Sequence, residues 1–346
     1  MAFVERSETF AALDLGTTNC RLLIARPGRD GLRVIDSFSR IVRLGEGLDG
    51  CGALSDLAIR RTVDALGVCA AKISNHHVTR RRFVATEACR RASNCRDFMS
   101  QVFDATGLEL EVIPTHEEAR LAVAGCAPLL DPNRRNALVF DIGGGSTEVS
   151  WVDVARGRGG AVRTWIRGVV SLPFGVVSLT DRYRHRDTTR SVYDEMVELV
   201  AAEFRDFDRA FNIGRRIARG GVQMLGSSGT VTTLAGIHAA LPRYERSLVD
   251  GTYLDFVDID RICADLVGMT ATERAQQPCI GVGRSDLMIA GCAILEAICS
   301  IWPVGRLRVA DRGVREGILA GLWQDSRTRP WRPDHGPSQP ASSTVA

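Results

Sequence analysis

The chain has 346 residues, an ordinary globular composition and a formal net charge of +3 at pH 7. This length allows two domains, each with its own core, and the small net charge gives no indication of nucleic-acid binding. No apolar run approaches the length of a membrane-spanning helix, and the first residues do not resemble a signal peptide. The ten cysteines form no Cys-x-x-Cys pair and no zinc-spaced cluster. We therefore expect a cytoplasmic protein with reduced thiols and with neither a nucleic-acid nor a membrane partner.

The first part of the chain alternates strand-like and helix-like segments. An apolar hairpin is predicted over residues 11–25, a further strand over 32–44, and a helix over 57–73, where apolar residues have helical spacing. Then follow a strand at 82–86, helices at 87–91 and 96–107, a strand at 110–113 and a helix at 117–127. This order after an opening hairpin is typical of a mixed α/β sheet.

The second part restarts with another hairpin, around Asp141. It is followed by a strand at 161–167, a helix at 194–211, a strand at 222–225, a helix at 231–240, an apolar helix at 286–301, a strand at 307–310 and a closing helix at 313–323. The repetition predicts two similarly folded α/β domains that arose by duplication, with a ligand cleft between them. Residues 326–346 are rich in proline and serine and lack periodicity, so we expect a disordered tail.

One motif occurs in both halves. In each copy an apolar strand ends in an aspartate, Asp14 or Asp141, and a turn of glycine and hydroxyl residues follows. Glycine lets the backbone approach a ligand with its N–H groups exposed, and an aspartate can hold a hydrated divalent cation against phosphate. The pair predicts a phosphate clamp formed by Gly16, Thr17, Thr18 and Asn19 in the first loop and by Gly143, Gly144, Gly145 and Ser146 in the second.

Two further features add to this clamp. A third loop of Ser227, Ser228, Gly229 and Thr230 connects a strand to a helix, and helix N-termini attract anions. Glu117 and Glu118 open helix 117–127, where acidic side chains also stabilise the helix dipole. A carboxylate beside a phosphate clamp could instead deprotonate an attacking water. Position alone leaves both readings of the two glutamates open.

Five segments together resemble the Ppx/GppA family of exopolyphosphatases and guanosine pentaphosphate phosphohydrolases, within the actin–Hsp70–sugar kinase superfamily. They are residues 12–17, 85–92, 117–121, 141–148 and 226–234, and residues 171–175 and 311–317 match as well. The resemblance covers about residues 10–322 and is to the short, two-domain form. It implies two duplicated actin-like (ribonuclease H-like) domains with mixed five-stranded sheets and an interdomain cleft. The implied first domain is 1–124 plus about 310–325, and the second is 125–309.

The resemblance also implies roles for single residues. Glu118 matches the catalytic general base, and Asp141 and Glu148 match carboxylates around the metal and the nucleophilic water. The implied cofactor is Mg²⁺ or Mn²⁺, with Asp14, Asp141 and Glu148 as its ligands. Arg90 matches an arginine that contacts the phosphate chain, and charge-assisted contacts of this kind are strong.

The sequence departs from the family pattern at two places and also contains two runs of basic residues. The first loop has Thr17-Thr18-Asn19 where the family usually has Ser-Asn-Ser or Thr-Asn-Asn, so we expect altered contacts rather than lost activity. His116 stands where a small residue is common, and we expect it at the surface. Arginines in 80–82 and 182–186 either guide a polyanion to the cleft or are simply solvated.

The implied activity is that of an exopolyphosphatase, which hydrolyses the terminal phosphoanhydride bonds of inorganic polyphosphate and releases orthophosphate. Guanosine pentaphosphate is the alternative substrate. An ATPase of the Hsp70/actin kind is less favoured because no substrate-binding domain follows the closing helix. A phosphate-binding regulator without turnover is less favoured because Glu118, Asp141 and Glu148 are all present. Chain-length preference, metal identity and the existence of a homodimer stay open.

Overall fold

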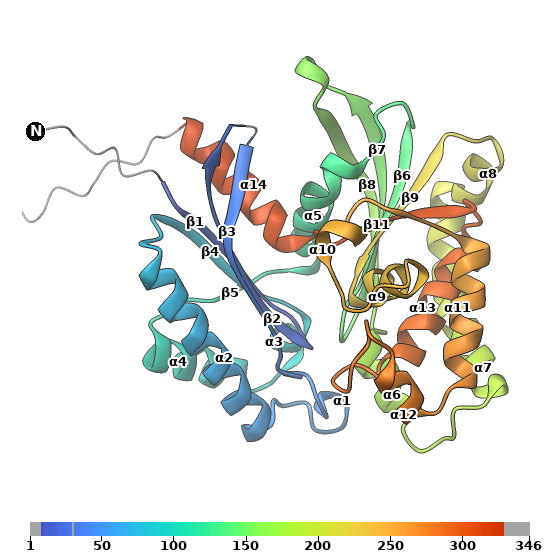
Figure 1. Ribbon diagram of the computed structural model, residues 1–346, viewed down its shortest axis with the longest axis horizontal. Helices are drawn as coiled ribbons and strands as arrows, with labels where there is room; N and C mark the ends of the chain where they lie inside the picture. Colours follow the sequence, from blue (N-terminus) through green and yellow to red (C-terminus); the bar gives the residue numbers. More distant parts are fainter. Residues whose placement is uncertain (1–7, 30, 329–346) are drawn as a thin grey trace, which may run out of the picture.

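Two β-sheets organise the protein, with helices between them and on their outer faces (Figure 1). The computed structural model describes residues 8–29 and 31–328. In spatial order the first sheet contains β3 (Gly31–Ile41), β2 (Asn19–Gly28), β1 (Phe10–Leu15), β4 (Arg80–Ala85) and β5 (Glu111–Val112). The β1–β2 and β2–β3 pairs are antiparallel, whereas β4 is parallel to both β1 and β5. The first sheet is therefore mixed, as the sequence predicted.

The second sheet repeats this order and adds one strand. It contains, in spatial order, β8 (Val162–Leu172), β7 (Thr147–Arg156), β6 (Asn136–Ile142), β9 (Val222–Ser228), β11 (Arg306–Ala310) and β10 (Tyr253–Asp255). Within the described residues this sheet thus has six strands, where five were expected. The extra strand, β10, pairs antiparallel with β11. It is only three residues long and buries only Leu254, so it has no periodicity to detect.

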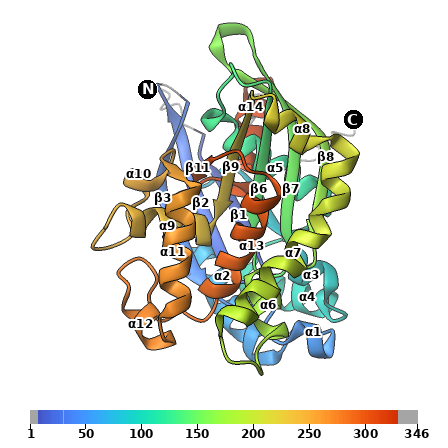
Figure 2. The ribbon, with the colours of Figure 1, turned by 90° about the vertical axis from the view of Figure 1, so that its right-hand side faces the viewer.

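Separate apolar cores cover the two faces of each sheet. Helices α2 (Asp56–Asn75) and α4 (Cys95–Thr106) pack on the outer face of the first sheet. The outer face of the second sheet is covered by α7 (Arg190–Phe211), α9 (Gly229–His238), α11 (Phe256–Gly268) and α13 (Met288–Ile301), as Figure 2 shows. Apolar side chains at helical spacing, such as Val200 and Phe204 of α7, face this core.

Helices α5 (Thr115–Cys126) and α14 (Val314–Thr328) lie between the sheets (Figure 1). Their backbones are in contact, because a Cβ added at Gly125 would lie 2.0 Å from the Gly313 carbonyl oxygen. One added at Gly317 would lie 2.0 Å from the carbonyl oxygen of Leu121. Leu121 belongs to the core under the first sheet and Val123 to the core under the second. The position of α5 is therefore fixed relative to both sheets.

Shorter elements complete the described chain. They are α1 (Leu48–Cys51), α3 (Glu87–Arg91), η1 (Ala127–Leu129), η2 (Arg158–Gly160), α6 (Val176–Arg182), α8 (Ile213–Ala218), α10 (Arg246–Val249) and α12 (Ala271–Gln276). Helix α14 continues to Thr328, so residues 326–328 of the expected tail are helical, and residues 329–346 lie outside the described residues. No helix in the described part of the chain is long and apolar enough to cross a membrane.

The sheets suggest how the chain divides. Every strand of the first sheet lies within residues 10–112, and every strand of the second lies within 136–310. Helix α14 then returns to pack against the first sheet, where Ile318 and Leu319 join Phe10. We keep the division into 1–124 plus about 310–325 and 125–309 as a proposal.

Candidate active site

The two copies of the aspartate–glycine motif form hairpins of the same geometry. In the β1–β2 hairpin the Gly16 N–H donates to the Asn19 carbonyl at 2.9 Å. In the β6–β7 hairpin the Gly143 N–H donates to the Ser146 carbonyl, also at 2.9 Å. Each loop therefore follows a strand that ends near its aspartate, Asp14 or Asp141, and is closed by the same bond. The sequence repeat corresponds to a repeat in three dimensions.

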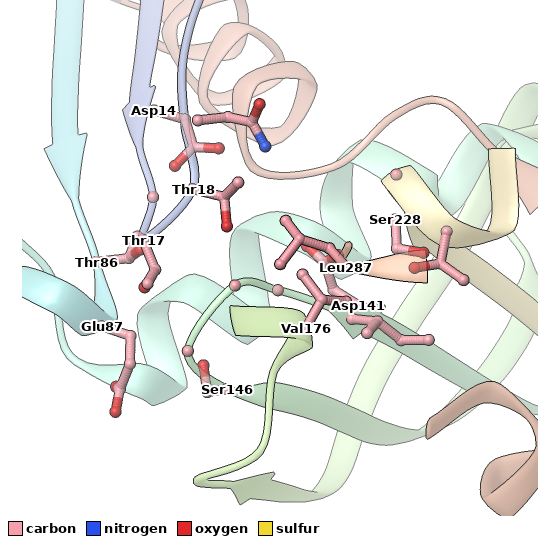
Figure 3. Close-up of a pocket in the computed structure, with 18 of the residues that line it drawn as sticks. Asp14, Thr17, Thr18, Thr86, Glu87, Asp141, Ser146, Val176, Ser228 and Leu287 are labelled. Atoms are coloured by element: carbon pink, nitrogen blue, oxygen red, sulfur yellow. The ribbon is translucent and has the colours of Figure 1, made fainter. Parts of the chain in front are cut away.

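The two loops touch each other across the gap between the sheets. A Cβ added at Gly144 would lie 2.2 Å from Thr18 Oγ1, and one added at Gly145 would lie 2.9 Å from Thr17 Oγ1. Since real side chains do not approach so closely, only glycine permits this contact. Together the loops line one cavity of about 880 Å³, seen in Figure 3 with Asp14 and Asp141 both labelled.

Most of the residues predicted from the sequence line this one cavity. They are Asp14, Gly16, Thr17, Thr18, Asn19, Glu118, Asp141, Gly143, Gly144, Gly145, Ser146, Ser228, Gly229 and Thr230. Three predicted residues do not line it. Arg90 is paired with Glu118, Glu148 lies opposite Asp141 on the neighbouring strand, and Ser227 lines a neighbouring cavity.

Glu118 is the glutamate of the pair that faces the cavity. Arg90 Nη1 donates to Glu118 Oε2 at 2.7 Å, and both side chains are about 15% exposed (16% and 14%). Arg90 also donates to Glu87 Oε2, at 2.7 and 3.1 Å, and to the Ile113 carbonyl. Burial, and then the nearby charge of Glu148, raise the pKa of Glu118 to about 8. The contact between Arg90 and a phosphate chain stays a prediction, because its guanidinium is occupied by carboxylates here.

Glu117 has a different environment on the same helix. It accepts hydrogen bonds from Arg120 Nε at 2.6 Å and from Arg82 Nη1 at 2.7 Å. The hydrogen bonds from Arg120 and then Arg82 lower the pKa of Glu117 to about 2. Arginines thus hold both carboxylate oxygens of Glu117, which does not line the cavity, whereas Glu118 lines it and, among the described residues, has only Oε2 paired.

Glu148 lies opposite Asp141 in the register of the β6–β7 pair. It is buried and accepts a hydrogen bond from Ser171 Oγ at 2.8 Å. Burial raises the pKa of Glu148 to about 7, although hydrogen bonds from Ser146 and Ser171 oppose that shift. Glu148 is thus a buried carboxylate beside Asp141, held in place by Ser171.

Asp14 and Asp141 both line the cavity, and within the described residues neither carboxylate has a hydrogen bond or an ion pair. Burial raises the pKa of both, to about 7 for Asp141. Two oxygens of the adjacent loop, Thr18 Oγ1 and Asn19 Oδ1, are also buried without a hydrogen-bond partner. Buried polar atoms are normally paired, so these two oxygens are available to bind a further group.

This donor set fits a hard cation. Carboxylate and amide oxygens are suitable ligands for Mg²⁺, which commonly takes one or two carboxylates, several waters and substrate phosphates. Within residues 8–29 and 31–328, no three His, Cys, Asp or Glu side chains are grouped closely enough to hold a metal by themselves. A site of Asp14 and Asp141 completed by a substrate is compatible with both observations, and Glu148 as a third metal ligand stays a prediction.

The third loop adds a helix N-terminus to the cavity. Ser228 caps α9 by accepting a hydrogen bond from the Val231 N–H at 2.9 Å, and Gly229 and Thr230 follow it into the wall. Ser227 instead donates from Oγ to the Arg312 carbonyl at 2.6 Å. Three of the four predicted residues of this loop therefore reach the main cavity.

The structure adds arginines that the sequence reading did not single out. Arg21 and Arg284 line the main cavity and a second one of about 1050 Å³, which Arg315 also lines. Within the described residues, none of these three guanidinium groups has a hydrogen bond or an ion pair, and burial lowers the pKa of Arg284 and Arg315. Arg21 could have been found from the sequence repeat. It lies opposite Asp14 in the first hairpin, as Glu148 lies opposite Asp141 in the second. In both hairpins the opposite residue follows the aspartate by seven positions.

The remaining residues noted in the sequence, His116 and the two basic runs, have ordinary surroundings. His116 is exposed, as expected. In the two basic runs, Arg82 pairs with Glu111 and Glu117, and Arg186 pairs with Glu195. A guiding role of these runs for a polyanion stays a prediction.

Comparison with known proteins gives the same family from sequence and from structure. A sequence model of the Ppx/GppA phosphatase family matches residues 23–325. Exopolyphosphatase 2 of Mycobacterium tuberculosis is 31% identical over an alignment of 326 residues that covers 90% of this chain and 98% of that protein. A solved exopolyphosphatase-like protein superimposes with a TM-score of 0.82 at 30% identity, covering 93% of this chain and 99% of its own.

The Ppx/GppA family member of Aquifex aeolicus gives a TM-score of 0.74 at 29% identity, with 92% of this chain and 98% of that chain covered. These relatives are matched over nearly their whole length, so the likeness includes both sheets. The chain therefore belongs to the Ppx/GppA phosphatase family and is a phosphoanhydride hydrolase.

Proposed function

We propose that this protein is an exopolyphosphatase that hydrolyses the terminal phosphoanhydride bond of inorganic polyphosphate and releases orthophosphate. The observation that carries the proposal is the contact of two glycine loops across a cavity that Glu118 also lines. The relative from Mycobacterium tuberculosis, named exopolyphosphatase 2, supports the choice of substrate. All ten cysteines are free thiols, which supports a cytoplasmic location.

In the proposed reaction the loops hold the terminal phosphate and Glu118 acts on water. The water oxygen attacks the terminal phosphorus while Glu118 accepts the proton of the water. The bond between that phosphorus and the bridging oxygen breaks, and the shortened chain leaves with the oxygen. Burial makes Glu118 a stronger proton acceptor than an exposed glutamate, and its hydrogen bond from Arg90 orients the carboxylate.

We also propose that a divalent cation, Mg²⁺ or Mn²⁺, completes the site. Asp14 and Asp141 would hold it, with the unpartnered Asn19 Oδ1 nearby, while Glu148 orients this side of the cavity. When bound, the cation offsets negative charge on the phosphate oxygens. The residues themselves exclude bulk water and fix the direction of attack, which supplies most of the catalysis in phosphoryl transfer.

The neighbouring arginines favour a substrate with several phosphates. Arg21 and Arg284 line both cavities, and Arg315 lines the second. Unpaired guanidinium groups are strong partners for phosphate oxygens. A polyphosphate whose end lies at Glu118 would extend toward these arginines.

The second cavity also favours a second candidate substrate, guanosine pentaphosphate. The aromatic side chains of Phe38 and Tyr244 line this cavity beside the arginines. A purine base stacks favourably on such rings. The same chemistry would then act on a nucleotide whose terminal phosphate lies between the loops.

Parallel assays of orthophosphate release decide between these possibilities. Purified protein is given long polyphosphate, short polyphosphate, guanosine pentaphosphate or ATP at equal concentrations of terminal phosphate, with Mg²⁺. The highest kcat/KM on polyphosphate supports the main proposal, and the highest value on guanosine pentaphosphate supports the alternative. A preference for ATP would contradict both.

A further inference from the structure

Arg43 connects the two sides of the ligand cleft. It lies just after β3 of the first sheet, and its side chain reaches the segment 281–287, which precedes α13 of the second. Arg43 Nη1 and Nη2 donate to the two carboxylate oxygens of Asp286, each at 2.9 Å. Nη2 also donates to the Gly283 carbonyl at 3.1 Å. This two-pronged geometry gives the contact a defined direction.

The backbone around Arg43 is bound to the first phosphate loop. The N–H groups of Val42 and Arg43 donate to the Thr18 carbonyl at 2.8 and 3.0 Å, and the Gly45 N–H donates to the Thr17 carbonyl at 3.0 Å. Arg43 itself has a left-handed backbone, with φ of 47°, which is uncommon for a residue other than glycine. Such a conformation persists only where the surroundings impose it.

Arg61 of α2 supplies part of that constraint. Its guanidinium donates to the carbonyls of Val42 and Arg43 at 3.0 and 3.2 Å, and to Glu46 at 2.8 Å. The turn that carries Arg43 is thus held from both sides, by the phosphate loop and by a helix. These contacts hold the backbone of Arg43 in place, so its side chain reaches the opposite segment from a fixed position.

The opposite segment, 281–287, has no regular secondary structure but contributes to the cavity. Arg284 and Leu287 line the cavity, and Figure 3 labels Leu287 there. Arg284 Nη1 would lie 3.4 Å from a Cβ added at Gly229, so its guanidinium lies against the third loop. From its own side the segment is tethered by Arg274, which donates to the Ser285 carbonyl at 3.3 Å. From across the cleft it is tethered by Arg43.

We propose that Arg43 is a positioning residue that fastens segment 281–287 across the cleft and so holds Arg284 at the phosphate-binding cavity. The inference rests on the proposed function in taking the ligand of Arg284 to be the phosphate chain. The side chains of Arg43 and Asp286 are 28% and 46% exposed, and exposed ion pairs add little to overall stability. A small free-energy difference is nevertheless enough to change the fraction of molecules in which segment 281–287 is held against the cleft. Loss of the pair should therefore affect substrate use more than melting temperature.

The test is a double-mutant cycle with Arg43→Gln, Asp286→Asn and the double variant. We expect each single variant to lower kcat/KM for polyphosphate about 5- to 20-fold, mainly through a higher KM, with no further loss in the double variant. The charge-exchanged pair Arg43→Asp with Asp286→Arg should recover most of the loss, and Arg43→Lys part of it. Arg209→Gln, which removes an exposed ion pair with Asp206 on α7, is the matched control and should behave as wild type.

A second measurement needs no substrate. Hydrogen exchange of peptides that cover 281–287 should be faster in Arg43→Gln than in the wild type and in Arg209→Gln, while melting temperatures stay within about 2 °C of each other. Wild-type kinetics in both single variants, losses that add in the double variant, or unchanged exchange in 281–287 would overturn the proposal. If the wild type hydrolyses none of the substrates, the proposed function fails, and the exchange result still decides whether Arg43 fastens the segment.

Discussion

Arg90 binds Glu118 without lining the cavity: its guanidinium donates to Glu118 at 2.7 Å, and of the two residues only Glu118 lines the cavity. The same guanidinium is bound by Glu87. A cation behind the carboxylate orients it and favours its charged form, without blocking the approach of a water from the cavity. Arg90 is thus arranged to act on Glu118, whatever contact it makes with a phosphate chain.

Replacing Glu118 by Gln should lower kcat by about 10²–10⁴, the usual contribution of a general base, while polyphosphate still binds. Glu117→Gln is the matched control, because Glu117 is the preceding residue and its carboxylate pairs with Arg82 and Arg120. That control should keep turnover near the wild-type value. Steady-state phosphate release measures both variants, and a Glu118→Gln enzyme with normal kcat would remove Glu118 from the mechanism.

Replacing Arg90 by Gln should shift the pH dependence of kcat. The positive charge of Arg90 lowers the pKa of Glu118, which burial otherwise raises. A base must be deprotonated to act, so the rate rises with pH as Glu118 titrates. Without Arg90 this rising limb should move to higher pH by about one unit or more. Arg90→Lys keeps the charge and should move the limb less, and identical profiles in Arg90→Gln and wild type would contradict the assignment.

The stability of the metal-free protein should fall as the pH rises from about 5 to about 8. Burial raises the pKa of Glu118 to about 8 and those of Asp141 and Glu148 to about 7, from ordinary values of 4.5, 3.8 and 4.5. These groups bind protons more tightly in the folded state than in the unfolded state, so their stabilisation is lost as they deprotonate. Melting temperatures in EDTA across this range test the point. In Glu118→Gln the melting temperature should fall less steeply with pH. A wild-type melting temperature that rises with pH would contradict the prediction.

Gly144→Ala should lower turnover by about 10²-fold, because the new methyl group would collide with Thr18 Oγ1 and separate the two phosphate loops. Gly67→Ala is the control, since a Cβ at that position of α2 meets nothing within 4 Å. Alanine there should leave kcat unchanged and raise the free energy of unfolding by about 0.5–1 kcal/mol. Phosphate release and urea denaturation measure the two effects. Full activity of Gly144→Ala would show that contact between the loops is not required.

Removal of divalent cations should abolish turnover, and Mg²⁺ should restore it. Asp14→Asn or Asp141→Asn should raise the Mg²⁺ concentration for half-maximal rate, because each removes a charged oxygen from the cavity. A titration of the initial rate with Mg²⁺ measures this. Ser227→Ala, whose hydroxyl bonds to the Arg312 carbonyl outside the main cavity, is the comparison and should leave the midpoint unchanged.

Much of the fold was predictable because its signals are local. The hairpins around Asp14 and Asp141 repeat in the sequence, and long helices such as α7 have a clear apolar spacing. Strand β10 was missed because three residues have no period, and the segment 281–287 was missed because turns carry little pattern. The loop residues could be placed in the cavity wall from the sequence, since glycine and hydroxyl residues next to a strand have few other uses, and their binding of phosphate stays a prediction.

Contacts between side chains that are far apart in the sequence could not be predicted from it. Glu117 and Glu118 are adjacent and chemically equal, and only their partners, Arg82 and Arg120 or Arg90, separate them. Arg284 reaches the cavity from a turn far along the chain, beyond any local pattern. Whether the pKa of a buried carboxylate is raised or lowered likewise depends on neighbours from other elements.

The corresponding positions of the two hairpins carry opposite charges, Arg21 in the first and Glu148 in the second. After duplication the two halves have thus lost their equivalence at the point where they meet the ligand. The cavity consequently carries both signs of charge, with Arg21 and Arg284 lining it together with Asp14, Glu118 and Asp141. The proposed polyphosphate would bind along Arg21, Arg284 and Arg315, and its terminal phosphate would approach the carboxylates through the proposed cation. Such an arrangement would suit the cleavage proposed above, at the end of a chain rather than within it.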